Sequence, residues 1–441
     1  MIFLSLAGAF TVQWLLFRKR PLYDPCWGIF IIYLYYAYFV PISMVLTGDY
    51  QILLVEQPIW VNEADLYLAT IVNFFGFTGM MAGYWAVTRK HLPEEGTARL
   101  PLLEIFRHFP TIRVLVGAVV ACAMLIIFFY QRELLSVLAG YESKIETNYQ
   151  SSAFSFLMGI ALLFLSINAN YLSLLARNGL TIAVGAGLAF ILISFLVFSK
   201  QPFIFAYLAA ICYLSRNRRI SPFFLTMGLS VFVVIALVYF VPVYASYRGT
   251  GVVDLSVAGG ASSAVIASDA MGPFGVMIYA FNGYVRMDGH PLWQSFVLWI
   301  PRAIWSGRPL DLPEAFAREI IVGWQPGQGL AFSPLAEGYV RLGLAGVGAF
   351  MALCGALVAG MQRLATRFVT AEARIPVALT LGCTLALAML RGTLSVVVTH
   401  GVQMIVPIAV VGFVTWVLTR SSARHGSERL LNVGSEHSVS S

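Results

Sequence analysis

Charged residues are scarce in this sequence. Only 11% of its 441 residues are charged, against 59% that are hydrophobic, and the mean hydropathy is +0.80. Soluble globular domains carry about a quarter charged residues, so the composition excludes that class and indicates a polytopic membrane protein. Lipid offers no partner to an unpaired backbone N–H or C=O group. We therefore expect the membrane-crossing segments to be helices and the fold to be all-α.

Motifs that handle nucleotides or metals are absent as well. None of the four lysines follows a glycine, which excludes a Walker A loop, and there is no HExxH motif and no Asp-x-Asp pair. The five cysteines lie inside apolar runs without C-x-x-C spacing, so no disulfide framework is indicated. The glycines at 343, 346 and 348 are interpreted as small residues that let spans approach closely. We expect no metal and no cofactor, and a phosphate-activated substrate handled without a metal remains open.

Apolar runs of a length that crosses a bilayer recur along the chain. One crossing takes about 20 predominantly apolar residues as helix. We predict eleven spans, at residues 1–17, 26–47, 65–88, 112–130, 153–175, 179–198, 202–215, 222–245, 343–361, 375–390 and 395–419. Residues 1–441 are thus predicted to form a single transmembrane domain, with one large extramembrane loop at 246–342 and a flexible tail at 420–441.

The distribution of Lys and Arg predicts the orientation. With the N-terminus outside, alternate loops place 18 of the 28 basic residues and 7 of the 21 acidic residues on one side. Short loops rich in Lys and Arg stay in the cytoplasm, so we predict an external N-terminus and a cytoplasmic C-terminus. The net charge of +7 then reflects topology and contact with anionic lipid headgroups, and it does not indicate a nucleic-acid partner.

The 246–342 loop has an aromatic, apolar centre. Trp293, Trp299 and Trp305 are evenly spaced among aliphatic residues, which is typical of a segment lying at the membrane surface with its rings among the headgroups. Pro301 should bend or end any helix there. We expect interfacial helices in this loop, with anchoring as the first role of the tryptophans and stacking on sugar faces as a second.

Cations gather on the outer face, where few are expected. Arg391 is the sharpest case, because it lies in the apolar stretch LALAMLRGTLSVVVTH at the turn of a predicted helical hairpin. An ionisable residue costs about 2.5–3.5 kcal/mol near the membrane centre and is a functional candidate, although its side chain could instead extend to the headgroups. The planar guanidinium suits phosphate oxygens, so we expect several cations to converge on one anion. The candidates are Arg391, Arg308, Arg248, Lys200, Arg302, Arg286 and Arg341.

A transfer reaction at this face would also need a proton acceptor. Glu337 lies just before the ninth predicted span, where it could act as a base or could simply pair with Arg341 four residues later. His400 lies near the outer end of the last span and is suited to proton transfer, although a hydrogen-bonded structural role is the commoner one. Both residues are kept as candidates.

The residues above, in this order, resemble the Wzy-type O-antigen and oligosaccharide repeat-unit polymerases. The resemblance rests on IPRAIWSGRP at 300–309, on GLAFSPLAEGYVRLGLAGVG at 329–348, on FSKQP around Lys200, on YRG around Arg248 and on the lone Arg391. It covers most of the chain and is specific mainly over about 300–360. Ser306 stands where family members commonly have proline. Lys200 stands where they commonly have arginine, so it keeps the charge without the planar fork.

The resemblance implies a glycosyltransferase of the bacterial inner membrane, with a GT-C-like architecture and its large loop in the periplasm. Such proteins join oligosaccharide units linked to undecaprenyl pyrophosphate, and membrane lipids and a chain-length regulator would be further partners. Carried over by position, Arg308, Arg248, Lys200 and Arg391 would surround pyrophosphate and sugar. The predicted catalytic residues are Arg391, Arg308, Arg248 and Glu337, and the predicted substrate-binding residues are Lys200, Arg302, Arg286, Arg341, His400 and Trp305.

Three alternatives remain open on the sequence. An O-antigen ligase would use the same chemistry to attach finished chains to the lipid A core. A transporter or flippase for an anionic lipid-linked glycan would carry charges near the bilayer midplane and an internal repeat. A scaffold subunit of an export assembly would tolerate loss of each external arginine.

Overall fold

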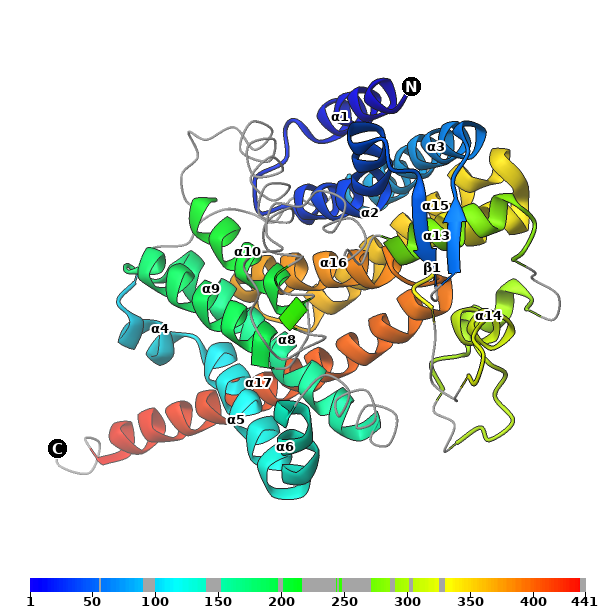
Figure 1. The fold of residues 1–441 in the computed structure, drawn as a ribbon. Helices are drawn as coiled ribbons and strands as arrows, with labels where there is room; N and C mark the ends of the chain where they lie inside the picture. The colour runs from blue at the N-terminus through cyan, green and yellow to red at the C-terminus, as the bar shows by residue number, and fades with distance from the viewer. Residues whose placement is uncertain are drawn as a thin grey trace.

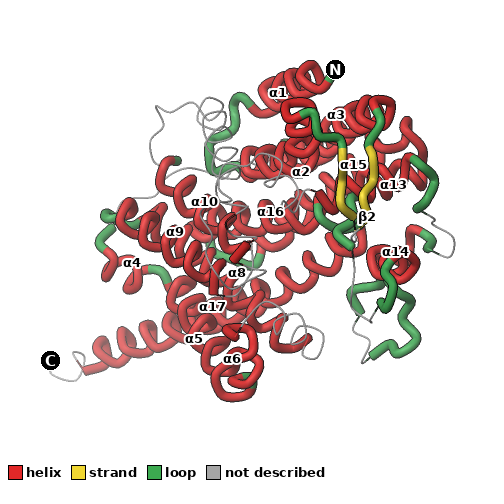
Figure 2. Tube along the Cα trace, in the orientation of Figure 1, coloured by secondary structure: helices red, strands yellow, loops and turns green. Residues whose placement is uncertain are grey.

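The computed structural model describes residues 1–54, 57–89, 100–139, 152–196, 201–215, 243, 246–247, 271–285, 290–300, 304–324 and 330–436. It is mostly helical (Figure 2), consistent with the predicted all-α membrane fold. The α-helices are α1 (Ile2–Phe17), α2 (Pro25–Thr47), α3 (Glu63–Thr88), α4 (Leu102–His108), α5 (Pro110–Phe129), α6 (Gln131–Ala139), α8 (Ser152–Leu175), α9 (Gly179–Leu196), α10 (Gln201–Leu214), α13 (Met271–Phe281), α14 (Leu312–Ile320), α15 (Pro334–Arg367), α16 (Arg374–Leu390) and α17 (Leu394–Glu436).

Seven of the described helices are long and apolar enough to cross a membrane, namely α2, α3, α5, α8, α15, α16 and α17. This bears out a multi-pass membrane protein. The predicted spans at 1–17, 179–198 and 202–215 correspond to the shorter apolar helices α1, α9 and α10. The predicted span at 222–245 lies almost wholly outside the described residues. Of the predicted flexible tail, residues 420–436 are the end of the helix α17.

Local sequence fixes where several of these helices begin. Asp24 precedes α2 and its Oδ1 accepts a hydrogen bond from the N–H of Cys26 at 3.0 Å, with Pro25 at the first helical position. Ser333 caps α15 in the same way, because its hydroxyl accepts the N–H of Leu335 at 3.2 Å. Side-chain oxygens at these positions satisfy N–H groups that have no partner inside the helix.

Small residues bring α3 and α15 into close contact. A Cβ atom on Gly79 or Gly83 would overlap the backbone of Gly348 or Ala352 across the interface. Close approach of this kind is how small residues stabilise helix pairs in membranes, where lipid removes the hydrophobic drive between helices. The predicted packing role is thus confirmed for Gly348. Helix α16, the most buried candidate span, packs against α2, α8, α15 and α17 (Figure 1).

The loops predicted to share the cytoplasmic face lie together at one end of the bundle. Arg20 donates to the carbonyl of Thr88 at 3.0 Å, and Arg363 donates to the carbonyl of Val87 at 2.9 Å. The backbone at Leu100 pairs with the chain at 175–177. These contacts involve the loops after α1, α3 and α8 and the last turns of α15. The α16–α17 turn forms the other end, called here the hairpin end.

Three features of the fold have no counterpart in the sequence prediction. A two-stranded antiparallel hairpin, β1 (Gln51–Leu54) with β2 (Gln57–Trp60), follows α2. Helix α13 lies inside the predicted 246–342 loop and buries Met271, Phe274 and Val276 against neighbours that include α15, α2 and α3. Helix α15 starts at Pro334, well before the predicted span, and is kinked at Gly343, where φ is 67° and ψ is −176°.

Candidate functional site

Arg391 lies at the hairpin end, as the sequence predicts. It is the C-cap of α16, and only Gly392 and Thr393 separate it from the first residue of α17. Its N–H donates to the carbonyl of Leu387 at 3.2 Å, and the N–H groups of residues 396 and 397 donate to the carbonyl of Thr393. The turn is therefore tied to both helices, and the exposed Arg391 side chain extends from a fixed backbone.

An open hollow with a volume of about 340 Å³ lies beside this turn. We call it the Arg391 hollow. Its lining combines one cation, two carboxylates and several apolar residues. The lining residues are Asp311, Pro313, Glu314, Leu330, Ala331, Arg391, Gly392 and Val396. Sites for small ligands typically measure roughly 300–1,000 Å³, so the hollow is large enough for a ligand. Its polar groups are of the kinds that bind an anion and accept a proton.

Helix α14 supplies the acidic wall of the hollow. Asp311 caps this helix, because its Oδ1 accepts the N–H of Glu314 at 3.0 Å, and a proline occupies the first turn. The rest of α14 is held by aromatic contacts, since Phe316 packs edge-on against Phe332 and Tyr279 with ring centroids 6.0 Å apart in each pair. Glu314 is half-buried in the first turn, on the side that lines the hollow.

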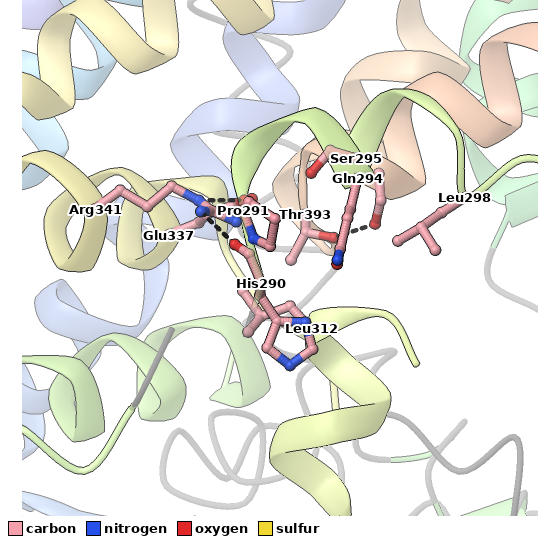
Figure 3. Close-up of a pocket in the computed structure, with 10 residues that line it drawn as sticks. His290, Pro291, Gln294, Ser295, Leu298, Leu312, Glu337, Arg341 and Thr393 are labelled. Atoms are coloured by element: carbon pink, nitrogen blue, oxygen red, sulfur yellow. Dashed lines mark hydrogen bonds and ion pairs between the residues drawn. The ribbon is translucent and has the colours of Figure 1, made fainter. Parts of the chain in front are cut away.

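Glu337 is at the centre of a second group of contacts beneath the same turn. Its Oε1 accepts from Nε of Arg341 at 2.9 Å, and its Oε2 accepts from the backbone N–H of Leu394 at 2.9 Å. The Glu337 side chain is 1% exposed. Arg341 also donates from Nη1 to the carbonyl of His290 at 2.8 Å (Figure 3). These four residues, called here the Glu337 cluster, join α15, the start of α17 and the loop at 290.

A small polar cavity adjoins the Glu337 cluster (Figure 3). Its internal space is about 10 Å³, which holds about one water molecule. Gln294, Ser295, Thr393 and Ser395 line it with neutral hydrogen-bonding groups, and the last two share a hydrogen bond of 2.8 Å. Oε1 of Gln294 is buried and receives no hydrogen bond from the described residues. The cavity and the Arg391 hollow share the 391–396 turn as a wall, but no sugar ring fits the cavity.

Arg308 holds the loop that borders this cavity. Its Nη1 donates to the carbonyls of Leu298 and Ile300 at 2.6 and 3.2 Å, and its N–H donates to the carbonyl of Trp305 at 3.1 Å. Trp305 is half-buried beside it. Arg308 does not line the Arg391 hollow, so in this conformation it acts on the loop backbone. Its Nε is buried and unpaired among the described residues.

The predicted site residue His400 and a second histidine, His290, have different surroundings. Nδ1 of His400 lies 2.9 Å from the carbonyl of Val396, one turn earlier in α17, which is the structural contact considered above. His290 lies outside the spans, in the loop bound by Arg341. Burial lowers the pKa of His290 below its usual value, and the positive charge of Arg341 lowers it further. His290 therefore favours its neutral form.

Four predicted site residues, Lys200, Arg248, Arg286 and Arg302, lie outside the described residues. Of the others, Arg391 lines the hollow, whereas Glu337 and Arg341 line the small cavity on the other side of the same turn. Arg308 contacts Leu298, which lines the small cavity, and its N–H donates to the carbonyl of Trp305. His400 lies one turn along α17. Among the described residues, no group of three His, Cys, Asp or Glu side chains could hold a metal ion.

Sequence reasoning missed the acidic wall of the hollow and the neutral polar groups of the cavity. Asp311 followed by Pro313 and Glu314 is a recognisable helix start, but nothing in that pattern indicates that it lies beside Arg391. Thr393 and Ser395 are ordinary residues at a helix start. Comparison of the chain with protein-family models, with curated proteins and with solved structures gives no match.

Proposed function

We propose that this protein is a membrane glycosyltransferase that joins oligosaccharide units carried on a polyprenyl pyrophosphate, and that the Arg391 hollow binds the reacting groups. One observation carries the proposal. A cation at the turn between two apolar helices and two carboxylates from a distant segment line one open hollow of about 340 Å³. A polyprenyl tail would lie in lipid along the spans, while its diphosphate and sugar would reach the hollow from the membrane surface.

The chemistry of the hollow suits transfer from a pyrophosphate. The acceptor hydroxyl oxygen forms a bond to C1 of the donor sugar, and the C1–O bond to pyrophosphate breaks with its electron pair leaving on the phosphate oxygen. Arg391 is proposed to stabilise the charge that develops there, an effect typically worth about 10²–10³ in rate. The proton of the hydroxyl passes to a carboxylate of the acidic wall. We assign this role to Glu314, which lines the hollow from the first turn of α14.

The remaining predicted cations belong to the same proposal. Arg248, Lys200, Arg286 and Arg302 are proposed as further contacts to phosphate and sugar, and Arg308 as the residue that shapes the loop next to the small cavity. The face that carries the hollow is proposed to be periplasmic in a bacterial inner membrane, following the distribution of Lys and Arg.

The positions of buried charges favour a transferase over a transporter. In the described part of the chain the buried charged side chains are Arg20, Asp24, Asp65 and Glu337. Arg20 and Asp24 precede α2, Asp65 is in the first turn of α3, and Glu337 is in the first turn of α15. A transporter site is expected near the middle of the spans, whereas these four charges lie at helix ends.

The test uses the full chain in lipid nanodiscs with an undecaprenyl-pyrophosphate oligosaccharide as both donor and acceptor. We expect a ladder of extended chains, formed also in the presence of a chelator. Arg391→Ala should lower the rate roughly 10²–10³-fold, and Glu314→Gln roughly 10²–10⁴-fold. Arg318→Ala is the matched control, because Arg318 is an exposed arginine on the last turn of α14 and does not line the hollow.

Two results would overturn the proposal. Unchanged chain growth in Arg391→Ala, with the protein inserted, would show that the hollow does not bind the leaving group. Transfer of preformed chains to a lipid A core acceptor, without extension of the lipid-linked units, would identify a ligase instead of a polymerase.

A further inference from the structure

The sequence leaves Glu337 open as a base or as the ion-pair partner of Arg341, and its surroundings do not fit a base. Both carboxylate oxygens already accept hydrogen bonds, one from Arg341 and one from Leu394, each at 2.9 Å. Within the described part of the chain, Glu337 lines a cavity of about 10 Å³, which admits about one water molecule and no sugar hydroxyl carried on a ring. A general base must reach the proton it removes within hydrogen-bond distance or through one water. Glu337 does not line the Arg391 hollow.

The hydrogen bond between Glu337 and Leu394 lies at the start of α17, directly after the α16–α17 turn. Leu394 is the first residue of α17, and the N–H groups of a first turn have no partner inside their own helix. A carboxylate there satisfies one of these groups and is also favoured by the positive end of the helix dipole. Arg391 lies three residues before Leu394. Gly392, between them, is tightly packed, because a Cβ atom added to it would lie 2.7 Å from the side chain of Val396.

Arg341 completes the arrangement from the other side. It neutralises the buried carboxylate and donates to the carbonyl of His290, so that the loop at 290 is fixed relative to the same turn. Without Arg341 the carboxylate would be a buried charge with no counterion. The cluster thus links three segments far apart in the sequence by hydrogen bonds to two backbone groups.

We propose that Glu337 is a positioning residue, which holds the backbone at Leu394 and thereby sets where the Arg391 guanidinium lies in the hollow. The inference rests on the proposed function, in which Arg391 binds a diphosphate. Glu337 then acts only through Arg391 and takes no proton from the acceptor. Its removal should weaken diphosphate binding, and it should have no further effect once Arg391 has been replaced.

Binding of undecaprenyl pyrophosphate without sugar separates positioning of Arg391 from proton transfer, because no glycosyl transfer occurs in this assay. We expect Arg391→Gln to weaken binding roughly 10- to 100-fold, as loss of a charge-assisted hydrogen bond does. Glu337→Gln offers one amide oxygen to two donors, so it should weaken binding about tenfold. The double variant should bind no more weakly than Arg391→Gln, which is the non-additivity expected of residues that act as one unit.

A second variant tests the same contact from the helix. Leu394→Pro removes the N–H that Glu337 accepts, and proline is tolerated at the first position of a helix. It should weaken binding as Glu337→Gln does, which keeps the test valid if Glu337→Gln fails to insert. Asp65→Asn is the matched control, since it removes another buried first-turn carboxylate, one that does not line the hollow.

The outcomes distinguish the inference from the proposed function. If Arg391→Gln weakens binding while Glu337→Gln and Leu394→Pro do not, the positioning role is wrong and the proposed function stands. The same holds if the effects of Arg391→Gln and Glu337→Gln multiply in the double variant. A Glu337→Gln enzyme that binds normally but loses roughly 10²–10⁴ in kcat, together with the acidic limb of its pH profile, would restore the base assignment. If Arg391→Gln changes neither binding nor chain growth, both proposals fail.

Discussion

The buried ion pair between Arg20 and Asp24 provides a quantitative test of the packing at the end opposite the hollow. Both side chains are nearly inaccessible, at 8% and 7% exposure, and Nη1 of Arg20 lies 3.3 Å from Oδ2 of Asp24. Oδ1 of Asp24 caps α2, while Nη2 of Arg20 donates to the carbonyl of Thr88 at the end of α3. One pair of charges therefore links α2 to the end of α3.

Substitution of Asp24 separates its two roles. Asn caps a helix about as well as Asp, so Asp24→Asn keeps the cap and leaves Arg20 as a buried charge without its counterion. Breaking a buried pair in this way costs about 3–5 kcal/mol. Asp24→Ala also loses the cap, which adds roughly 1 kcal/mol. The double variant Arg20→Met with Asp24→Asn removes both charges, and we expect it to recover at least half of the stability lost in Asp24→Asn.

The free energy of unfolding, measured in mixed micelles by titration with a denaturing detergent, checks these values. Glu104→Gln is the control, because Glu104 is an exposed carboxylate in α4 and should change stability by no more than about 0.5 kcal/mol. A loss below about 1 kcal/mol in Asp24→Asn would be well short of the 3–5 expected for a broken buried pair and would refute the reasoning. So would a double variant as unstable as Asp24→Asn, since the uncompensated charge would then not be the cause.

Three further predictions concern the backbone and the loop at 290. Gly343→Ala places a side chain at φ 67° and ψ −176°, a region occupied essentially by glycine, so it should cost about 1–3 kcal/mol and weaken undecaprenyl pyrophosphate binding in the same assay. Gly83→Ala should cost about 1–3 kcal/mol by overpacking against α15, whereas Gly117→Ala, where a Cβ meets nothing within 4 Å, should be neutral or slightly stabilising. Because the pKa of His290 is lowered in the folded protein, the unfolded chain binds more protons as pH falls from about 7 to about 5. Detergent unfolding should therefore become easier over that range, and His290→Gln should reduce the change.

The parts of the fold that follow from local composition could be predicted from the sequence. Lipid imposes helices on long apolar runs, so ten of the eleven predicted spans coincide with described helices, although α1, α9 and α10 are short. The grouping of loops by their Lys and Arg content also agrees with the contacts of Arg20 and Arg363 at the end opposite the hairpin end. Which face is cytoplasmic stays a prediction.

The parts that depend on contacts between distant segments could not be predicted. Glu337 and Arg341 are four residues apart on a helix, and their ion pair was foreseen as one of two alternatives. The other partner of Glu337 is a backbone N–H at Leu394, which no residue pattern reveals. Likewise α13 has only 11 residues, fewer than a span needs. Its length therefore does not reveal that it packs against α15, α2 and α3.

Gly343 shows how packing and site depend on one another. The part of α15 after Gly343 is fixed by backbone contact with α3 around Gly348. A straight continuation of that helix would carry residues 334–342 along the same axis. The kink at Gly343 changes this direction by a backbone conformation that essentially only glycine adopts. We infer that this change of direction lets Glu337 reach the N–H of Leu394. Gly343 was interpreted from the sequence as a packing residue, yet a Cβ on it would meet nothing within 4 Å. On this reasoning Gly343 helps to hold the turn that carries Arg391, because it directs Glu337 towards that turn.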